Sequence, residues 1–224
     1  MTVIVQAIPA TEAYPWLLRK HYARRLCPIS FAFGAFGDGM LVGVVTYGTP
    51  ASAPLRSGVC GDIWAEHVLE LNRLCCDHDK NTASQLVGRS LRMLPRPTIV
   101  VSYADTGKGH VGYVYQATNF LYTGLSTKRT DWKIEGMEHL HGVTVADMSR
   151  GKEDRAAFMR DTYGDAFYLE DRSRKHRYIT FIGSRHQAKA MRAALRYSVE
   201  PYPKGESRRY DDTANIETQA VMFL

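Results

Sequence analysis

The fold of this chain is indicated most clearly by residues 99–124, which read Ile-Val-Val-Ser-Tyr-Ala-Asp-Thr-Gly-Lys-Gly-His-Val-Gly-Tyr-Val-Tyr-Gln-Ala-Thr-Asn-Phe-Leu-Tyr-Thr-Gly. The segment begins with a continuous apolar run, Ile99 to Val101, which is typical of a strand buried on both faces of a sheet. The run ends at Asp105 in a glycine-flanked turn. Apolar residues then recur at helical spacing from Val111 to Tyr122, and Gly124 supplies a stop. The segment therefore predicts a strand, a turn and a helix, with polar side chains at the corner between them.

The residues before this segment predict a helix, an antiparallel hairpin, a strand and a second helix. Thr11 is a suitable helix cap, and Gly37-Asp38-Gly39 suits a hairpin turn. Pro95 and Pro97 end the second helix. A loop is expected over 49–61, which is rich in Pro, Ser and Gly. The hairpin strands are expected over 29–36 and 40–48, the next strand over Val68–Cys76, and the second helix directly after its cap, Asn81.

Residues 125–173 have a different character, with many charges and weak periodicity. They predict an insertion, partly helical around Asp154–Arg160, in a single domain that spans residues 1–224. A buried strand is expected next over Arg177–Gly183, followed by a short helix over 185–197. Together these two form a basic strand-helix element within residues 174–210. The whole pattern predicts an α+β protein.

The composition is that of a globular protein, with 45% hydrophobic residues among 224. No apolar run approaches the roughly 20 residues that a membrane helix needs. The N-terminus lacks the basic start and long apolar region of a signal peptide. The four cysteines show neither disulfide density nor Cys-x-x-Cys spacing. We therefore expect a cytoplasmic protein with reduced thiols and no membrane partner.

Positive charge is concentrated near the C-terminus. The net charge is +6, and between residues 172 and 209 eleven Lys and Arg residues stand against two acids. Such clustering is typical of a protein that binds nucleic acid. The alternative is a solvated surface helix, although such helices usually mix acids with bases. The residues expected to bind DNA are Arg174, Lys175, Arg177, Arg185, Lys189, Arg192 and Arg196.

The predicted strand-to-helix corner carries residues suited to proton transfer. A histidine such as His110 can shuttle protons near neutral pH, and a carboxylate such as that of Asp105 can orient it or accept a proton. Together with Tyr103 they would equally suit an iron site. The alternative is a turn-capping aspartate beside an ordinary histidine. His21 and Tyr22, at the end of the first helix, are candidates to face the same cleft, and His21, Asp105 and His110 are the candidate metal ligands.

Aromatic and carboxamide side chains follow the corner. Aromatic rings near a basic surface can stack an extruded base, and carboxamides supply both a donor and an acceptor for its Watson–Crick edge. We expect substrate binding at Tyr113, Tyr115, Gln116, Asn119 and Tyr122.

The predicted start of the helix after the Val68–Cys76 strand is a candidate donor-binding site. A helix N-terminus offers unpaired N–H groups and the positive end of a dipole, which suit a phosphate. The alternative is an ordinary capped helix. The residues concerned are Lys80, Asn81, Ser84 and Gln85. His139 with His141, and Cys75 with Cys76, are weaker candidates that we interpret as surface histidines and buried thiols.

Several longer motifs resemble the Mom family of phage DNA-modification proteins. The resemblance covers nearly the whole chain except residues 125–170. It is carried by Glu70-Leu71-Asn72-Arg73-Leu74, Lys80-Asn81-Thr82-Ala83-Ser84, Gly109-His110-Val111-Gly112, Tyr115-Gln116-Ala117-Thr118-Asn119-Phe120, Lys175-His176-Arg177-Tyr178 and Pro201-Tyr202-Pro203-Lys204-Gly205.

The resemblance implies a GNAT-like fold, with a central mixed sheet flanked by helices. It also implies a transferase that converts adenine in phage DNA to its N6-carbamoylmethyl form and so protects the DNA from host restriction. Bound iron is associated with the family. GNAT enzymes bind acyl-CoA through a glycine-containing loop, whereas this chain has Asn81, Ser84 and Gln85 there, which weakens the case for acyl-CoA. A conventional acyl-CoA-dependent acyltransferase acting on a protein or small amine is the alternative.

The product itself suggests another donor. N6-carbamoylmethyl-adenine has the same atoms as N6-glycyl-adenine, with the amide and the amine exchanged. A glycyl donor such as charged tRNA, followed by rearrangement, would therefore give this product. The expected partners are double-stranded DNA, tRNA and, in a homodimer, a second copy of the chain.

Overall fold

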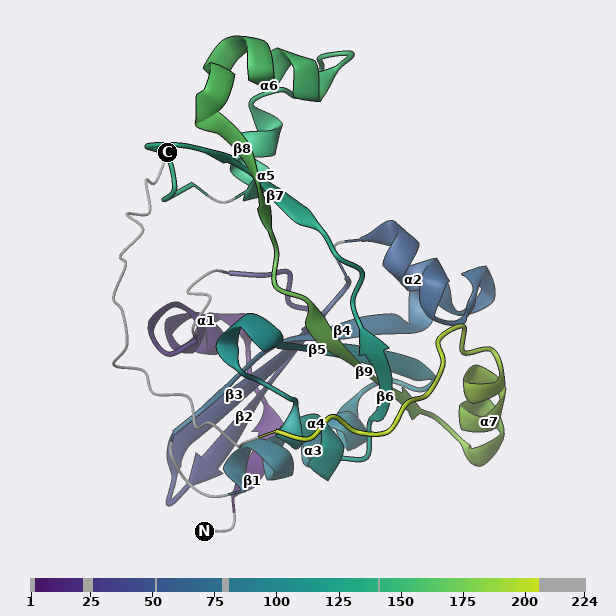
Figure 1. Cartoon of the computed structure of the whole chain (residues 1–224). Helices are drawn as coiled ribbons and strands as arrows, with labels where there is room; N and C mark the ends of the chain where they lie inside the picture. Colours follow the sequence, from purple (N-terminus) through teal and green to yellow (C-terminus); the bar gives the residue numbers. More distant parts are fainter. Residues whose placement is uncertain (1–2, 22–25, 51, 78–80, 141, 206–224) are drawn as a thin grey trace. The chain divides into compact units, whose positions relative to one another are not determined.

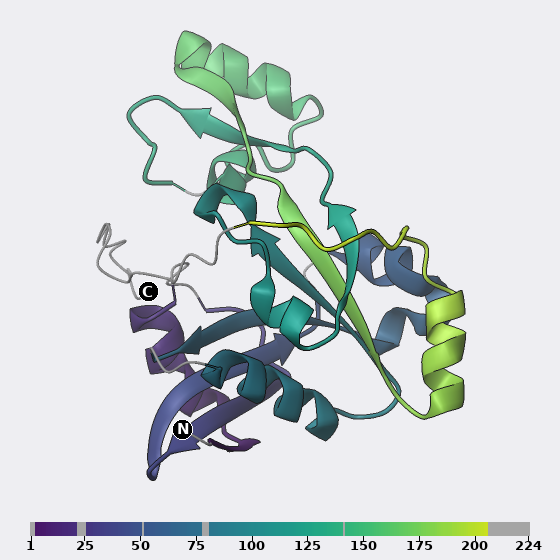
Figure 2. The ribbon, with the colours of Figure 1, turned by 60° about the horizontal axis from the view of Figure 1, so that its bottom comes forward.

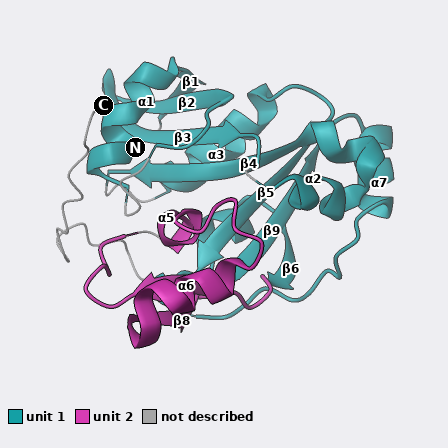
Figure 3. Cartoon of the chain, turned by 90° about the horizontal axis from the view of Figure 1, so that it is seen from above, with its two compact units in different colours: residues 1–125, 175–212 teal, residues 126–174, 213–224 magenta. Residues whose placement is uncertain are grey.

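The computed structural model describes residues 3–21, 26–50, 52–77, 81–140 and 142–205. Two of the predicted site residues, Tyr22 and Lys80, lie outside these ranges, as does His141. The chain divides into two compact units (Figure 3). Unit 1 contains residues 1–125 and 175–212, and unit 2 contains residues 126–174 and 213–224.

Unit 1 is built on a seven-stranded mixed sheet with the order β1-β2-β3-β4-β5-β9-β6 (Figure 1). Neighbouring strands are antiparallel except β4 and β5, which are parallel. The strands are β1 (Ile4–Ala7), β2 (Phe31–Gly37), β3 (Met40–Gly48), β4 (Val68–Cys76), β5 (Thr98–Asp105), β6 (Leu121–Leu125) and β9 (Lys175–Ile182).

Helices cover both faces of this sheet (Figures 1 and 2). On one face, α3 (Thr82–Met93) and α4 (Tyr113–Ala117) pack over a core that includes Val45, Leu71 and Val100. On the other face, α1 (Ala10–Arg19) packs over β2 and β3. That second face is also covered by α2 (Ala53–Cys60) and α7 (Arg185–Ala193), which pack against Ile99, Val101 and Ile179. The expected α+β class, a central mixed sheet flanked by helices, is confirmed.

Most strands and helices lie where the sequence patterns predict them. The hairpin β2–β3 and the strand Val68–Cys76 are confirmed, and α3 follows Asn81. Asn81 makes no side-chain cap, however, and has a positive φ of 71°. The first helix begins at Ala10 after Pro9, without a side-chain cap, so Thr11 lies inside the helix.

Two of the predicted elements were wrong. Helical spacing continued to Tyr122, but α4 ends at Ala117, and residues 121–125 form strand β6 because they pair with β9. The predicted loop over 49–61 contains helix α2, whose first turn is capped by Ser52 through a hydrogen bond from the Leu55 amide. In both cases a short apolar pattern was ambiguous, and tertiary pairing or capping decided the structure.

The sheet opens between the carboxyl ends of β4 and β5. Their pairing is confined to residues 68–71 of β4 and 99–102 of β5. Beyond this point β4 stays paired with β3 and β5 stays paired with β9. A bulge in β4 accompanies the opening, since Leu71 and Arg73 are opposite consecutive residues of β3 and Asn72 is the extra residue. This opening exposes polar side chains of two central strands.

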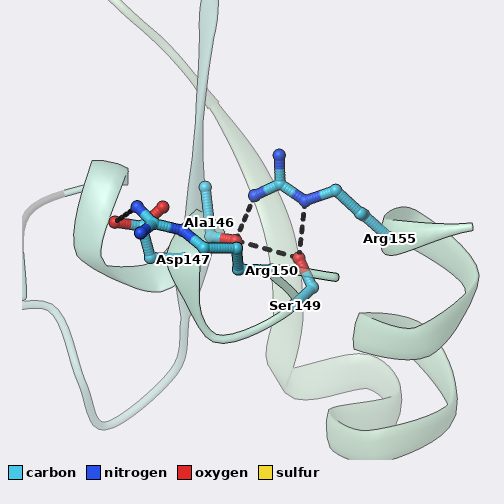
Figure 4. Close-up of polar contacts among 5 residues, drawn as sticks. All are labelled: Ala146, Asp147, Ser149, Arg150 and Arg155. Carbon is cyan, nitrogen blue, oxygen red and sulfur yellow. Dashed lines mark hydrogen bonds and ion pairs between the residues drawn. The ribbon is translucent and has the colours of Figure 1, made fainter. Parts of the chain in front are cut away.

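Unit 2 has its own small core. Strands β7 (Thr130–Ile134) and β8 (Phe167–Asp171) form an antiparallel pair, and Ile134, Val145 and Met159 are buried together. Helix α5 (Gly142–Asp147) is tied to α6 (Arg155–Tyr163) by Arg155, which donates to the Ser149 hydroxyl at 3.1 Å and to the Ala146 carbonyl (Figure 4). The helix expected around residues 154–160 is confirmed, and Asp154 caps it. That residues 125–173 are an insertion in a single domain stays a prediction.

No helix in the described part of the chain has the length and apolar character needed to cross a membrane.

Candidate active site

A row of polar side chains lies at the opening between β4 and β5. Side chains alternate between the faces of a strand, so Tyr103 and Asp105 share the face of Ile99 and Val101. Their register partners Arg177 and Lys175 on β9 share it too. Every member of the row is partly buried. We call the following residues the polar strip: Glu70, Asn72 and Arg73 of β4, Tyr103 and Asp105 of β5, and Lys175 of β9.

Asp105 is held by one hydrogen bond and one ion pair at the end of β5. Its Oδ1 accepts a hydrogen bond from the Gly107 amide at 2.9 Å, which caps the short 3-10 turn Thr106–Lys108. Its Oδ2 lies 3.9 Å from the Nζ of Lys175. The Asp105 side chain is only 14% exposed, against 40% for Lys175. Asp105 therefore caps the turn and also presents a positioned carboxylate to the strip.

The bulge in β4 fixes Asn72 and Arg73. The Asn72 amide accepts from the Thr46 hydroxyl at 2.6 Å and donates to the Pro28 carbonyl at 2.9 Å. Arg73 donates through Nη1 to the Asn72 carbonyl at 2.7 Å. Its Nε is buried and has no hydrogen-bond partner among the described residues. A buried guanidinium N–H without an acceptor is costly in a folded protein, so Arg73 is suited to binding a ligand oxygen.

The carboxyl group of Glu70 lies within electrostatic reach of two cations. Burial raises the pKa of its carboxyl group, while the charges of Lys175 and Arg73 oppose that rise. The pKa of a carboxyl group in such surroundings changes readily when a ligand binds and alters the local charge.

Two histidines lie within electrostatic reach of the strip. His21, directly after α1, is 6% exposed. Burial lowers its pKa to about 3, with further lowering by the charges of Arg73 and His110. Burial also lowers the pKa of His110, opposed by Asp105 and reinforced by Lys108. Both imidazoles are therefore neutral at pH 7, which suits hydrogen bonding better than positive charge.

The predicted iron ligands are not grouped as a metal site among the described residues. In that part of the chain, no three His, Cys, Asp or Glu side chains are grouped to hold a metal ion. Of the three candidates, Asp105 contacts Gly107 and Lys175, and His21 lies in the field of the Arg73 cation. Iron binding by these residues stays a prediction.

The predicted base-binding residues lie on the opposite face of the sheet. Tyr122 is in the core beneath α4, and the rings of Tyr115 and Tyr122 are each 5.3 Å from that of Tyr178. Gln116 donates to the Val111 carbonyl at 3.0 Å and to the Tyr178 hydroxyl at 3.1 Å.

The C-terminal segment also engages this group. Tyr113 donates to the Gly205 carbonyl, and Gln116 donates to that of Pro203. Asn119 has a positive φ of 60° in the turn before β6. These residues therefore lie on the α4 face of the sheet, whereas Asp105 lies on the other face. That they bind a base stays a prediction.

The predicted donor-binding residues stand at the start of α3. Ser84 donates to the Asn81 carbonyl at 3.0 Å, and the Gln85 amide makes the first helical bond to the same oxygen. The Thr82 hydroxyl is buried, with no hydrogen-bond partner among the described residues. Donor binding here stays a prediction.

The predicted DNA-binding residues fall into separate groups. Arg185, Lys189 and Arg192 are exposed on α7. Arg196 lies beyond the helix, beside Gly61. Arg177 is engaged internally, because it bonds the Thr123 hydroxyl and carbonyl at 2.9 and 2.7 Å and lies 3.5 Å from the Tyr197 ring centre. Lys175 belongs to the polar strip. Arg174, in unit 2, donates to the Ser126 carbonyl at 2.7 Å.

Sequence reasoning missed Glu70, Asn72 and Arg73 as site residues. They were assigned to a strand, and the available signal was the presence of two charges and an amide in an otherwise apolar run. Charged residues are rarely placed in a central strand unless they are paired or functional.

Comparison with solved structures finds acetyltransferases at low similarity. An N-acetyltransferase from Staphylococcus aureus Mu50 matches with a TM-score of 0.43 and 13% identity, over 81% of this chain and 99% of that one. The ribosomal-protein-S18-alanine N-acetyltransferase from Escherichia coli matches with a TM-score of 0.44 and 10% identity, over 81% and 95%. Scores this low support no conclusion about activity.

Sequence comparison is more informative. The methylcarbamoylase Mom of Escherichia phage Mu is 31% identical over 201 residues, which are 84% of this chain and 80% of the phage Mu protein. The model of the Mom protein family matches residues 2–204, a span that contains the whole polar strip. The chain belongs to the Mom protein family.

Proposed function

We propose that this protein is a transferase that modifies the N6 amine of adenine in double-stranded DNA, giving N6-carbamoylmethyl-adenine. Family membership and the name of the phage Mu relative, a methylcarbamoylase, support this proposal. The methylcarbamoyl, carbamoylmethyl and glycyl groups are isomers, so the relative's name fits transfer of a group with the atoms of glycine. In a phage-infected cell, the modified base would protect DNA from host restriction, and the enzyme would work in the host cytoplasm.

The observation that carries the proposal is the Asp105 carboxylate, oriented by the Gly107 amide and the Lys175 ammonium at the open end of β5. Adenine N6 must lose a proton as it forms a bond to carbon, and a carboxylate within reach can accept that proton. Extrusion of the base from the duplex would bring N6 to the strip. Neutral His21 and His110 would hydrogen-bond the base or the donor without adding charge.

Arg73 is the residue suited to the donor. Its unpaired buried Nε would donate to the carbonyl oxygen that becomes negative during acyl transfer. With a glycyl ester of tRNA as the donor, N6 bonds to the glycyl carbonyl carbon and the ester C–O bond breaks. Its electron pair goes to the ribose oxygen, which receives the N6 proton by way of Asp105. The products are N6-glycyl-adenine and free tRNA.

Rearrangement then gives the final base. The glycyl amine attacks C6 of adenine through a five-membered ring, so that a new C6–N bond forms and the original C6–N6 bond breaks. A proton moves from the attacking amine to the departing amide nitrogen. The former N6 becomes the carboxamide nitrogen, and the glycine nitrogen becomes the one attached to the ring.

Isotope labelling tests this scheme. Purified protein is incubated with duplex DNA and tRNA charged with ¹⁵N-glycine, and the nucleosides are fragmented in a mass spectrometer. We expect the label in the fragment that retains the ring-attached nitrogen. A modified adenine without label would reject glycine as the source, and label confined to the carboxamide would reject the rearrangement. Modification by acyl-CoA without tRNA would instead support the conventional acyltransferase.

A further inference from the structure

The end of the sheet farthest from the polar strip carries a group of exposed cations. Arg92 lies in the last turn of α3, and Arg96 lies just before β5 begins at Thr98. Strand β9 ends at Ile182, opposite Thr98, and leads directly into α7. Five exposed cations on three segments therefore flank this end, with Arg92 of α3 on one face of the sheet and the three cations of α7 on the other. We call them the basic end: Arg92, Arg96, Arg185, Lys189 and Arg192.

Packing fixes the direction in which α7 presents its charges. Met191 is fully buried against Ile99 and Ile179, and the Cys60 thiol contacts the Met191 carbonyl at 3.4 Å. The helix start is held by a capping box between Ser184 and Gln187. Arg185, Lys189 and Arg192 recur at the spacing of one helix face and span about 10 Å along the axis.

Few acids oppose these charges. Helix α7 contains no acidic residue. At the same end of the sheet, the 3-10 turn Asp62–His67 before β4 carries Asp62 and Glu66. Glu66 is already paired with Arg56, at 3.1 Å. The basic end therefore keeps a positive surface that attracts a polyanion.

The distance to the polar strip follows from the strands that join the two places. Thr98 and Ile182 face each other at the basic end, and Asp105 and Lys175 face each other in the strip. The seven residue steps between them correspond to about 23 Å. In B-form DNA this length corresponds to about seven base pairs.

We propose that the basic end binds the phosphates of duplex DNA up to about seven base pairs from the adenine that reacts in the polar strip. The proposal rests on the proposed function, because it takes the modified base to be in DNA. A duplex is stiff over this length, so one duplex can reach both places. Helix α7 contains no Phe, Tyr or Trp, whereas single-strand sites usually add aromatic stacking to positive charge.

The test uses duplexes with one target adenine and either four or twelve base pairs on each side. Lys189→Ala/Arg192→Ala is compared with Arg150→Ala/Arg160→Ala, which removes two exposed cations from unit 2. We expect wild-type protein and the control to prefer the long duplex to the same degree, and the α7 variant, which keeps three of the five cations, to prefer it less. The slope of log K against log salt on long DNA should fall by about 2 for the α7 variant.

A length preference and salt slope that are as large in the α7 variant as in wild-type protein would overturn the proposal. Equal losses of length preference and salt slope in both double variants would overturn it too. Removal of any two exposed cations would then weaken DNA binding in the same way. Binding is measured separately from modification, so the two proposals can fail independently. Length-dependent binding without any modified adenine would reject the proposed function. It would leave the proposed binding of duplex DNA by the basic end intact.

Discussion

Asp105 and Lys175 face each other at the end of the β5–β9 ladder, with the Oδ2 of Asp105 3.9 Å from the Nζ of Lys175. The pair is possible because β5 and β9 stay in register to the last residue of β5 and the first residue of β9, although β4 has already separated from β5. A carboxylate is thereby held at the opening of the sheet, within electrostatic reach of His110. This relationship leads to the first prediction.

Asp105→Asn is expected to abolish modification while leaving the fold intact. The amide keeps the size of the carboxylate and an oxygen for the Gly107 amide, but it cannot take a proton from adenine N6. The rate of modification should fall by about 10² or more, with unchanged DNA binding and thermal unfolding. Lys175→Ala is the companion variant and should retain part of the rate. Normal modification by Asp105→Asn would remove this residue from the mechanism.

Arg73→Ala is expected to weaken transition-state stabilisation. Removal of the guanidinium takes away the donor proposed for the carbonyl oxygen, so the rate at saturating donor should fall by about 10² to 10³. Arg56→Ala, which removes an arginine paired with Glu66, is the control. The measurement is kcat separately from KM for the donor. A change in KM alone would mean that Arg73 binds the donor without assisting the reaction.

The two residues of a buried hydroxyl pair are expected to contribute unequally to stability. The Tyr47 hydroxyl and the Ser90 Oγ are 2.7 Å apart, and Ser90 also donates to the Val87 carbonyl at 3.0 Å. Tyr47→Phe leaves Ser90 with its second partner and should cost about 1 kcal/mol. Ser90→Ala leaves a buried tyrosine hydroxyl unpaired and should cost about 1–3 kcal/mol. Urea unfolding of the two variants measures the difference, and a larger loss in Tyr47→Phe would contradict this account.

His21 should make the protein sensitive to mild acid. Burial lowers its pKa from 6.5 to about 3 in the folded protein. Below pH 6.5 the unfolded chain therefore binds a proton that the folded chain does not. Stability contributed by this residue is present above pH 6.5 and is lost as the pH falls toward 3, by up to about 1.4 kcal/mol per pH unit.

The measurement is the free energy of unfolding between pH 7 and pH 4. His21→Gln should flatten its dependence on pH, whatever the variant does to stability at pH 7. His139→Gln, which replaces an exposed histidine, is the control variant. Equal slopes in wild type and His21→Gln would show that His21 is protonated in the folded protein.

Strands with strong local signals were predictable from the sequence. Strand β4 begins and ends where its apolar run does, and β2 and β3 flank a glycine-rich turn. Strand β6 was mistaken for the end of a helix because Leu121 and Tyr122 also continue the helical spacing. Only pairing with β9, more than fifty residues later, resolves that ambiguity. Such non-local pairing leaves no local signal.

The candidate site was predictable only in part. Asp105 and His110 follow a buried strand and could be selected as a corner. The role of Arg73 depends on a bulge and on the separation of two parallel strands, which no local pattern reports. Tyr115 and Tyr122 looked like base-stacking rings, but register places Tyr122 opposite Tyr178 in the core. Side-chain alternation assigns a face only when the register is known.

Mass spectrometry of nucleosides tests the central claim most directly. DNA is isolated from cells that express the wild-type protein or Asp105→Asn, digested to nucleosides and compared with DNA from cells without the protein. The account predicts a new adenine nucleoside, heavier by one glycine residue, in the wild-type sample only. DNA with unmodified adenine in the presence of folded wild-type protein would contradict it.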